Sequence, residues 1–219
     1  MDMGTGKTRT ALELAKIRLD KDKIDCVLWL CPYSIQNNLT DDLDKHCDGW
    51  ESIIKVCGIE TLSSSIKKNA ELLRYVSEYR VFLVVDESSL VKNHKALRSE
   101  SIERIAMKCP YRVILNGTPI SKNEKDLYMQ WRILDWRILG YKSFWSFSAN
   151  HLEYDERGRI RRCLNVSTLT DKIAPYTYQV KREECMTLPE KSHWSCGFEL
   201  GDRYEEYIHT VNEYLDQVD

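Results

Sequence analysis

The chain has 219 residues, of which 42% are hydrophobic and 30% are charged. This balance excludes an intrinsically disordered chain and allows a sizeable hydrophobic core. No apolar run approaches the ~20 residues that a membrane-spanning helix needs, and no secretory signal opens the chain. We therefore expect a soluble intracellular protein without a membrane partner, either cytoplasmic or nucleoid-associated.

Charge is unevenly distributed along the chain. The formal net charge is −2, but residues 1–140 carry +2, residues 141–182 carry +4 and residues 183–219 carry −8. This distribution divides the chain into a nearly neutral body, a basic segment and an acidic tail.

The eight cysteines show no metal-binding spacing. They include no C-x-x-C pair, and no paired histidines accompany them. We therefore expect free thiols in a reducing compartment rather than disulfides or a structural zinc site.

Short apolar segments alternate with helical patterns along the first 140 residues. Helices are predicted at 8–20, 66–79, 95–107 and 124–139, and strands at 26–31, 53–57, 81–85 and 112–115. The strands at 26–31 and 81–85 are continuous apolar runs, typical of strands buried on both faces. The pattern predicts an α/β fold with a mainly parallel sheet flanked by helices, whose ligands bind at the carboxyl ends of the strands.

A glycine-rich loop precedes the first predicted helix. It comprises Met3, Gly4, Thr5, Gly6, Lys7 and Thr8. Glycines let backbone N–H groups point at a phosphate, the Lys7 ammonium would reach the β and γ phosphates, and the Thr8 hydroxyl would bind Mg²⁺. An ordinary glycine-rich turn is the alternative. Such a loop normally follows a strand, and no residues before Met1 supply one here.

Two acidic residues follow the strongest predicted strand. Asp86 and Glu87 come directly after the apolar run 81–85. Asp86 would hold Mg²⁺, and Glu87 would orient or deprotonate an attacking water. A pair of solvated turn acids is the alternative, and the phosphate-loop pattern upstream makes it less favoured.

The order of these motifs resembles the first RecA-like lobe of a superfamily 2 helicase-type ATPase of the SNF2-like branch. Residues 1–8 resemble the family's motif I, 28–34 resemble motif Ia, and 84–89 stand at motif II. The further matches are 58–62 with motif Ib, 90–93 with the lysine–asparagine pair that follows motif II, 115–120 with motif III, 121–127 with the segment after it, and 181–182 with 188–191 at the join to a second lobe.

The resemblance implies a RecA-like P-loop lobe that binds ATP and Mg²⁺. It implies catalytic roles for Lys7, Asp86 and Glu87, with Thr8 and Asp86 as metal ligands. It also implies a DNA partner, double-stranded in this branch. The implied nucleic-acid and coupling residues are Pro32, Ser34, Gly117, Thr118, Lys122 and Asn123.

The sequence also departs from the family pattern. Ser88 and Ser89 replace the small residue and the histidine of motif II, and that histidine normally helps to couple the nucleotide to motif III. The strand before motif I and the second lobe are not seen in the sequence, so we expect a fragment, a truncated gene product or one subunit of a split enzyme. The expected domains are a lobe at 1–140, an insertion at 141–182 and an acidic connector toward a second lobe at 183–219.

The insertion mixes aromatic and basic residues. We expect Phe144, Trp145 and Phe147 to lie in the core. Arg157 and Arg159, with Arg161 and Arg162 beyond them, flank a predicted hairpin tip around Gly158. This tip either contacts DNA phosphates or is a solvated charged turn.

The sequence therefore favours the ATP-binding lobe of a DNA-dependent ATPase or translocase that is weakly active alone. One alternative is a non-catalytic DNA- or protein-binding module derived from such a lobe. Another is a P-loop kinase or small ATPase that binds no nucleic acid, against which the Gly117-Thr118-Pro119 segment argues.

Overall fold

The computed structural model describes residues 1–2, 4–47, 49–185, 194–197, 201 and 204–216. The chain divides into two units, Met1–Met186 and Thr187–Asp219. The resemblance at 188–191 falls outside the described residues.

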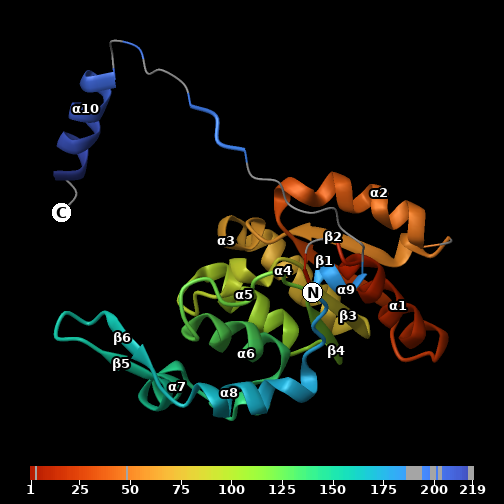
Figure 1. Ribbon diagram of the computed structural model, residues 1–219. Coiled ribbons are helices and arrows are strands. Elements are labelled where there is room, and N and C mark those ends of the chain that lie inside the picture. The colour runs from red at the N-terminus through yellow and green to blue at the C-terminus, as the bar shows by residue number, and fades with distance from the viewer. Residues whose placement is uncertain (3, 48, 186–193, 198–200, 202–203, 217–219) are drawn as a thin grey trace. The chain divides into compact units, whose positions relative to one another are not determined.

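The first unit is built on a parallel sheet of four strands (Figure 1). The strands are β1 (Cys26–Cys31), β2 (Ile54–Gly58), β3 (Val81–Val85) and β4 (Tyr111–Ile114), in the order β2-β1-β3-β4. Every residue of β1 and β3 is buried. These two central strands are covered on both faces, which explains why their sequences are continuous apolar runs.

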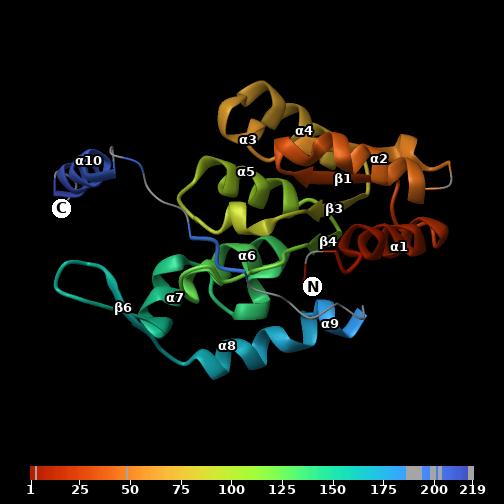
Figure 2. The same cartoon turned by 45° about the horizontal axis from the view of Figure 1, so that its top comes forward.

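Helices cover both faces of this sheet (Figure 2). One face packs against α1 (Lys7–Asp20) and α2 (Gln36–His46), whose buried residues join Trp29 and Phe82 in one hydrophobic cluster. The other face packs against α3 (Thr61–Ser64), α4 (Ile66–Glu78), α5 (Leu97–Ala106) and α6 (Lys125–Leu139) in a second cluster. The predicted α/β fold, a parallel sheet flanked by helices, is confirmed.

One predicted helix is interrupted. Asp135 has extended backbone angles, φ −166° and ψ 118°, within α6. Its carboxylate accepts the backbone N–H of Arg137 at 2.9 Å and bonds the Arg137 guanidinium. Asp135 therefore ends one helical segment and caps the next, which the hydrophobic spacing of 124–139 did not indicate.

The segment after α6 folds into α7 (Phe144–His151), a hairpin of β5 (Leu152–Tyr154) and β6 (Ile160–Cys163), and α8 (Val166–Ile173). Phe147 is fully buried as expected, and Phe144 is half-buried with its ring stacked on His94. The expectation for Trp145 is wrong, because 80% of it is exposed. Neighbouring helical positions point about 100° apart, so three closely spaced aromatics cannot all face one core.

Strand β4 forms one edge of the sheet. It pairs with β3, and each of its residues is only half-buried. The side of β4 that faces away from β3 has no strand partner in the part of the chain that the structure describes. The chain continues past this edge through α8, a 3-10 turn (Ala174–Tyr176) and α9 (Arg182–Cys185).

The second unit contains α10 (Tyr204–Asp216), whose first turn carries Glu205 and Glu206. Acidic side chains are favourable at a helix N-terminus. Among the described residues of both units, none of the helices has the length and apolar character that crossing a bilayer would require. Among the described residues, Cys26, Cys31, Cys57 and Cys109 are buried free thiols.

Candidate functional site

The glycine-rich loop turns directly into the first helix. Gly4 and Gly6 have φ values of +79° and +82°, in the left-handed region that L side chains rarely adopt. Gly6 stands at the N-cap of α1, and no side chain caps the first N–H groups of the helix. The helix therefore presents unpaired donors and its positive dipole end, which is a favourable environment for an anion.

The Lys7 side chain folds back over this loop. Its ammonium donates to the carbonyl oxygens of Met1 at 3.3 Å and of Asp2 at 3.1 Å. The Thr5 hydroxyl also donates to Asp2, at 2.7 Å. Thr8 lies half-buried in the first turn of α1, and Met3 is outside the described residues. A phosphate group could take Lys7 from these carbonyls, because a charged acceptor forms the stronger hydrogen bond.

Asp86 lies at the carboxyl end of β3, and its backbone N–H donates to Leu30 at 2.7 Å. Burial raises the pKa of the Asp86 carboxyl above its ordinary value, and the Glu87 backbone N–H and the Lys7 ammonium offset this only in part. Lys7 and Ser88, two residues beyond Asp86, line one cavity, which brings the glycine-rich loop close to the carboxyl end of β3. A half-buried carboxylate at this position is a suitable ligand for a divalent cation.

Glu87 adopts a left-handed conformation, with φ 48° and ψ 56°. Its backbone N–H donates to the Asp86 carboxylate at 2.9 Å, and its own carboxylate accepts the Ser89 hydroxyl at 2.9 Å. A non-glycine residue in this region is strained and persists where its surroundings hold it. The next residue, Ser88, provides that anchor, since its N–H donates to the Leu115 carbonyl at 3.0 Å.

A buried polar network joins the loops that follow β3 and β4. The Ser88 hydroxyl donates to Gln130 Oε1 at 2.7 Å, and the Asn116 amide donates to Ser88 Oγ at 3.2 Å and to Gln130 Oε1 at 3.1 Å. Gln130 Nε2 donates to the carbonyls of Pro119 and Asp126, both at 2.8 Å. Ser88 and Gln130 are almost completely buried. We call these three residues the Ser88–Asn116–Gln130 hub.

Sequence reasoning assigned no role to Gln130. The available signal was its position in the predicted helix 124–139. Gln130 falls on the apolar stripe formed by Leu127, Trp131 and Leu134, where a polar residue needs buried partners.

A second group of polar contacts, which includes an ion pair, lies closer to the surface. Lys92 lies 3.6 Å from the Asp126 carboxylate and also donates to the Ser121 hydroxyl. Asp126 accepts the backbone N–H groups of Ser121 at 3.0 Å and of Lys122 at 3.2 Å. These bonds lower the pKa of Asp126 against the effect of its burial. The Lys92–Asp126 pair thus fixes the segment that carries Lys122.

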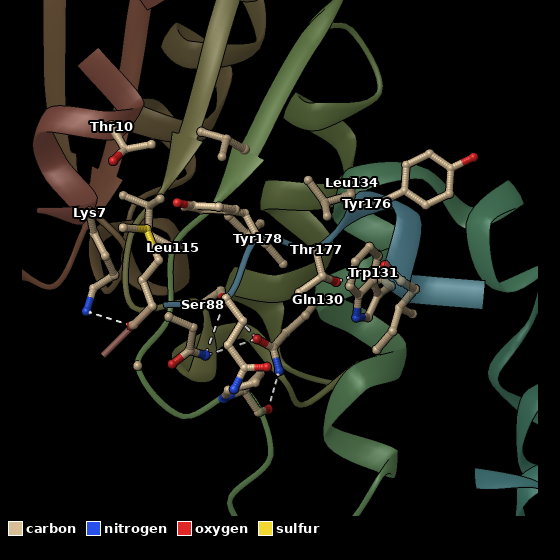
Figure 3. A pocket seen from close by; sticks show the side chains of 18 of the residues that line it. Lys7, Thr10, Ser88, Leu115, Gln130, Trp131, Leu134, Tyr176, Thr177 and Tyr178 are labelled. Atoms are coloured by element: carbon tan, nitrogen blue, oxygen red, sulfur yellow. Dashed lines mark hydrogen bonds between the residues drawn. The ribbon is translucent and has the colours of Figure 1, made fainter. Parts of the chain in front are cut away.

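A cavity of about 380 Å³ opens beside the site (Figure 3). It lies between β4, α6 and the chain from Ile173 to Gln179, with Lys7 and Ser88 on its border. Its lining is largely apolar and includes the side chains of Leu134, Trp131 and Tyr178, which Figure 3 shows around the opening.

The predicted nucleic-acid residues fall in two places. Pro32 and Ser34 follow β1, and Gly117 and Thr118 follow β4, with Lys122 and Asn123 further along the same loop. They share the carboxyl edge of the sheet with Asp86, because all four strands are parallel. Arg157 and Arg159 lie instead on the β5–β6 hairpin, which both overall views show projecting beyond α7 (Figures 1 and 2).

Comparison with known proteins gives a family for this architecture. The description "SNF2-related domain" matches residues 52–191. This range includes Asp86, Glu87 and all three hub residues. It begins after the glycine-rich loop and after Pro32.

Several characterised proteins are similar to the chain. A chromodomain-helicase-DNA-binding protein 1-like of Danio rerio is 27% identical over 58% of this chain and 14% of its own length. The TATA-binding protein-associated factor BTAF1 of Arabidopsis thaliana is 24% identical over 87% of this chain and 11% of its own length. The chain thus corresponds to a small part of these relatives.

A solved structure shares the fold. The Sulfolobus solfataricus SWI2/SNF2 ATPase core in complex with double-stranded DNA superposes with a TM-score of 0.60 at 23% identity. The match covers 80% of this chain and 38% of that one. The family match spans more than half of the chain and agrees with the fold, so the chain belongs to the family of SNF2-related domains.

Proposed function

We propose that this chain is the ATP-binding lobe of a DNA-dependent ATPase or translocase. The observation that supports the proposal is that Lys7 of the glycine-rich loop and Ser88, which directly follows Asp86 and Glu87, line one cavity. A phosphate-binding loop and a metal-binding carboxylate must meet in this way to hold one Mg²⁺-nucleotide.

The residues at this edge fit Mg²⁺-ATP. The N–H groups of Gly4 to Thr8 and the Lys7 ammonium bind phosphates, while Thr8 and Asp86 supply oxygen ligands for Mg²⁺. When bound, Mg²⁺ neutralises charge on the phosphates. Glu87 orients the attacking water in this proposal, and its place next to Asp86 at the carboxyl end of β3 supports that role.

Double-stranded DNA is the proposed nucleic-acid partner. The solved SWI2/SNF2 core of the same fold is in complex with double-stranded DNA. In this chain the loops after β1 and β4 place Ser34, Thr118 and Lys122 at the surface. Hydroxyl and ammonium groups at such positions contact backbone phosphates.

A second RecA-like lobe completes the proposed enzyme. The match to the solved ATPase core covers 38% of that chain. An arginine supplied from outside the lobe commonly accelerates phosphoryl transfer ~10³-fold or more. We therefore expect slow ATP turnover from this chain alone.

Nucleotide binding is the direct test. Isothermal titration with Mg²⁺-ATP should show binding to the parent chain. Lys7→Ala and Asp86→Asn should each weaken it by at least ~10-fold, because each removes a charge-assisted contact. Lys16→Ala, on a later turn of the same helix, is the matched control and should bind like the parent. Equal affinity in Lys7→Ala and Lys16→Ala would contradict the proposed site.

A non-catalytic DNA-binding module is the second candidate. The observation that favours it is Ser88-Ser89 in place of the family's small residue and histidine. Adding an excess of duplex DNA during an ATPase assay separates the two. Stimulated turnover supports the ATPase, whereas DNA binding with no turnover, even when a second lobe is supplied, supports the module.

A further inference from the structure

We propose that Gln130 is a positioning residue that joins the carboxylate loop after β3 to the DNA-facing loop after β4, so that nucleotide binding changes DNA affinity. This inference rests on the proposed function. It assigns to the Ser88–Asn116–Gln130 hub the coupling that the family's motif II histidine would otherwise provide.

The Gln130 side chain uses its full hydrogen-bonding capacity. Gln130 Oε1 accepts two hydrogen bonds and Nε2 donates two, so both ends of its amide are used. The Ser88 hydroxyl donates to Gln130 and accepts from Asn116. Ser88 and Gln130 are almost completely buried, so a displacement that breaks the bonds between them leaves a buried polar atom unpaired.

The hub reaches both loops. On one side it fixes Ser88, which directly follows the strained Glu87. On the other side Gln130 bonds the Pro119 carbonyl, and the Asn116 side chain accepts the N–H of Thr118 at 2.9 Å. If a movement of Glu87 on nucleotide binding displaces its neighbour Ser88, Thr118 and Pro119 must therefore follow or hub bonds must break.

The hub borders the cavity beside the glycine-rich loop. Ser88, Asn116 and Gln130 all line it, together with Lys7 (Figure 3). The glycine-rich loop and the hub therefore border the same cavity.

The test measures coupling rather than turnover, so it does not depend on a second lobe. The affinity of the parent chain for a fluorescein-labelled DNA duplex is measured by anisotropy, with and without Mg²⁺-AMPPNP. We expect the nucleotide to change the DNA dissociation constant by ~5-fold or more, the lower end of typical coupling between sites. Gln130→Leu, which keeps the volume and removes the amide, should bring this ratio close to one while each ligand still binds.

Two further variants separate positioning from general destabilisation. Asn69→Leu is the matched control, because the Asn69 amide also donates to two backbone carbonyls, Leu62 and Ser65, but on α4. It should keep the parent's coupling. The milder Ser88→Ala should lose coupling, and Ser88→Ala combined with Gln130→Leu should lose no more than either alone, since both break one network.

Hydrogen exchange gives a readout without ligands. In Gln130→Leu, amide protection should fall together in residues 86–92 and 115–122, and Asn69→Leu should leave both segments unchanged. Exchange that stays as in the parent in either segment, or unchanged coupling in Gln130→Leu with both ligands bound, would overturn the inference. Failure of the parent to bind Mg²⁺-AMPPNP would instead overturn the proposed function, and the exchange comparison would still decide whether Gln130 joins the loops.

Discussion

At the scale of single residues, Asp86 lowers the stability of the fold while it provides a ligand for a cation. Its carboxyl is desolvated at the end of a fully buried strand, and the Glu87 backbone N–H and Lys7 only partly offset that cost. Keeping a charge there without a cation opposes folding. Functional carboxylates are often found in such environments, because the bound cation later supplies the missing partner.

This environment predicts a pH-dependent gain in stability for Asp86→Asn. The raised pKa means that the folded chain binds the proton more tightly than the unfolded chain, so this residue's contribution to the free energy of unfolding falls as pH rises. At neutral pH and without Mg²⁺, Asp86→Asn should raise the Tm, by about 2–4 °C for each kcal/mol gained. The gain should vanish below the ordinary aspartate pKa of about 3.9, where the carboxyl is neutral in both states.

Thermal denaturation across a pH series checks this expectation. Asp41→Asn is the control, because Asp41 is exposed on α2 and should show no such gain. A Tm difference between Asp86→Asn and the parent that is the same at every pH would refute the electrostatic explanation.

At the scale of elements, the apolar runs in the sequence correctly predicted the positions of the two central strands. The strand residues 26–31 and 81–85 are apolar on both faces, and the structure has strands at those positions. The acidic pair could be placed at a strand end for the same reason. The break at Asp135 and the left-handed Glu87 could not, because each depends on hydrogen bonds with side chains or loops that spacing does not reveal.

The hub shows the same limit within the site. Its members come from three separate elements, and Ser88 and Gln130 are 42 residues apart. Asn116 and Ser88 could be read as loop residues, but nothing local connects either of them with α6. Only the packing of α6 against the ends of β3 and β4 brings the three together.

The unpaired edge of β4 makes a prediction of its own. Half-buried residues Val113 and Ile114 border the apolar cavity, and Met1 lies beside the carboxyl end of this strand. An extended segment of alternating valine and isoleucine fused ahead of Met1 should pair with β4 in parallel and bury apolar surface. We expect the Tm to rise by several degrees, at about 2–4 °C per kcal/mol.

A glycine–serine extension of the same length is the control and should leave the Tm unchanged. A proline at the centre of the apolar extension should abolish most of the gain, because proline removes a ladder hydrogen bond. Equal Tm values for the apolar and glycine–serine extensions would show that β4 does not accept a strand.

For the whole molecule, three of the four arginines of the β5–β6 hairpin form ion pairs with acidic residues of the same hairpin. Arg159 pairs with Asp155 at 3.3 Å, and Arg161 and Arg162 both pair with Glu153, at 3.4 and 2.7 Å. Arg157 has no ion pair among the described residues, although its backbone N–H donates to Asp155. Residues 152–163 contain four arginines and three acidic residues, a net charge of +1, so the hairpin offers less positive charge to a phosphate than the +4 of residues 141–182 indicates.

This pairing changes which substitution tests DNA contact by the hairpin. Arg157 is exposed and unpaired in the described structure, so Arg157→Ala should remove one phosphate contact and reduce the slope of log K against log salt by about 1. Glu153→Gln should act in the opposite direction, because it frees Arg161 and Arg162.

Anisotropy titrations at several salt concentrations measure both effects. Lys67→Ala, which removes an exposed lysine on α4, controls for the change in net charge. Base preference should not change, since phosphate contacts position a protein without specifying sequence. If Arg157→Ala and Lys67→Ala give the same slope, the hairpin is a solvated turn, and DNA binding is left to the loops after β1 and β4.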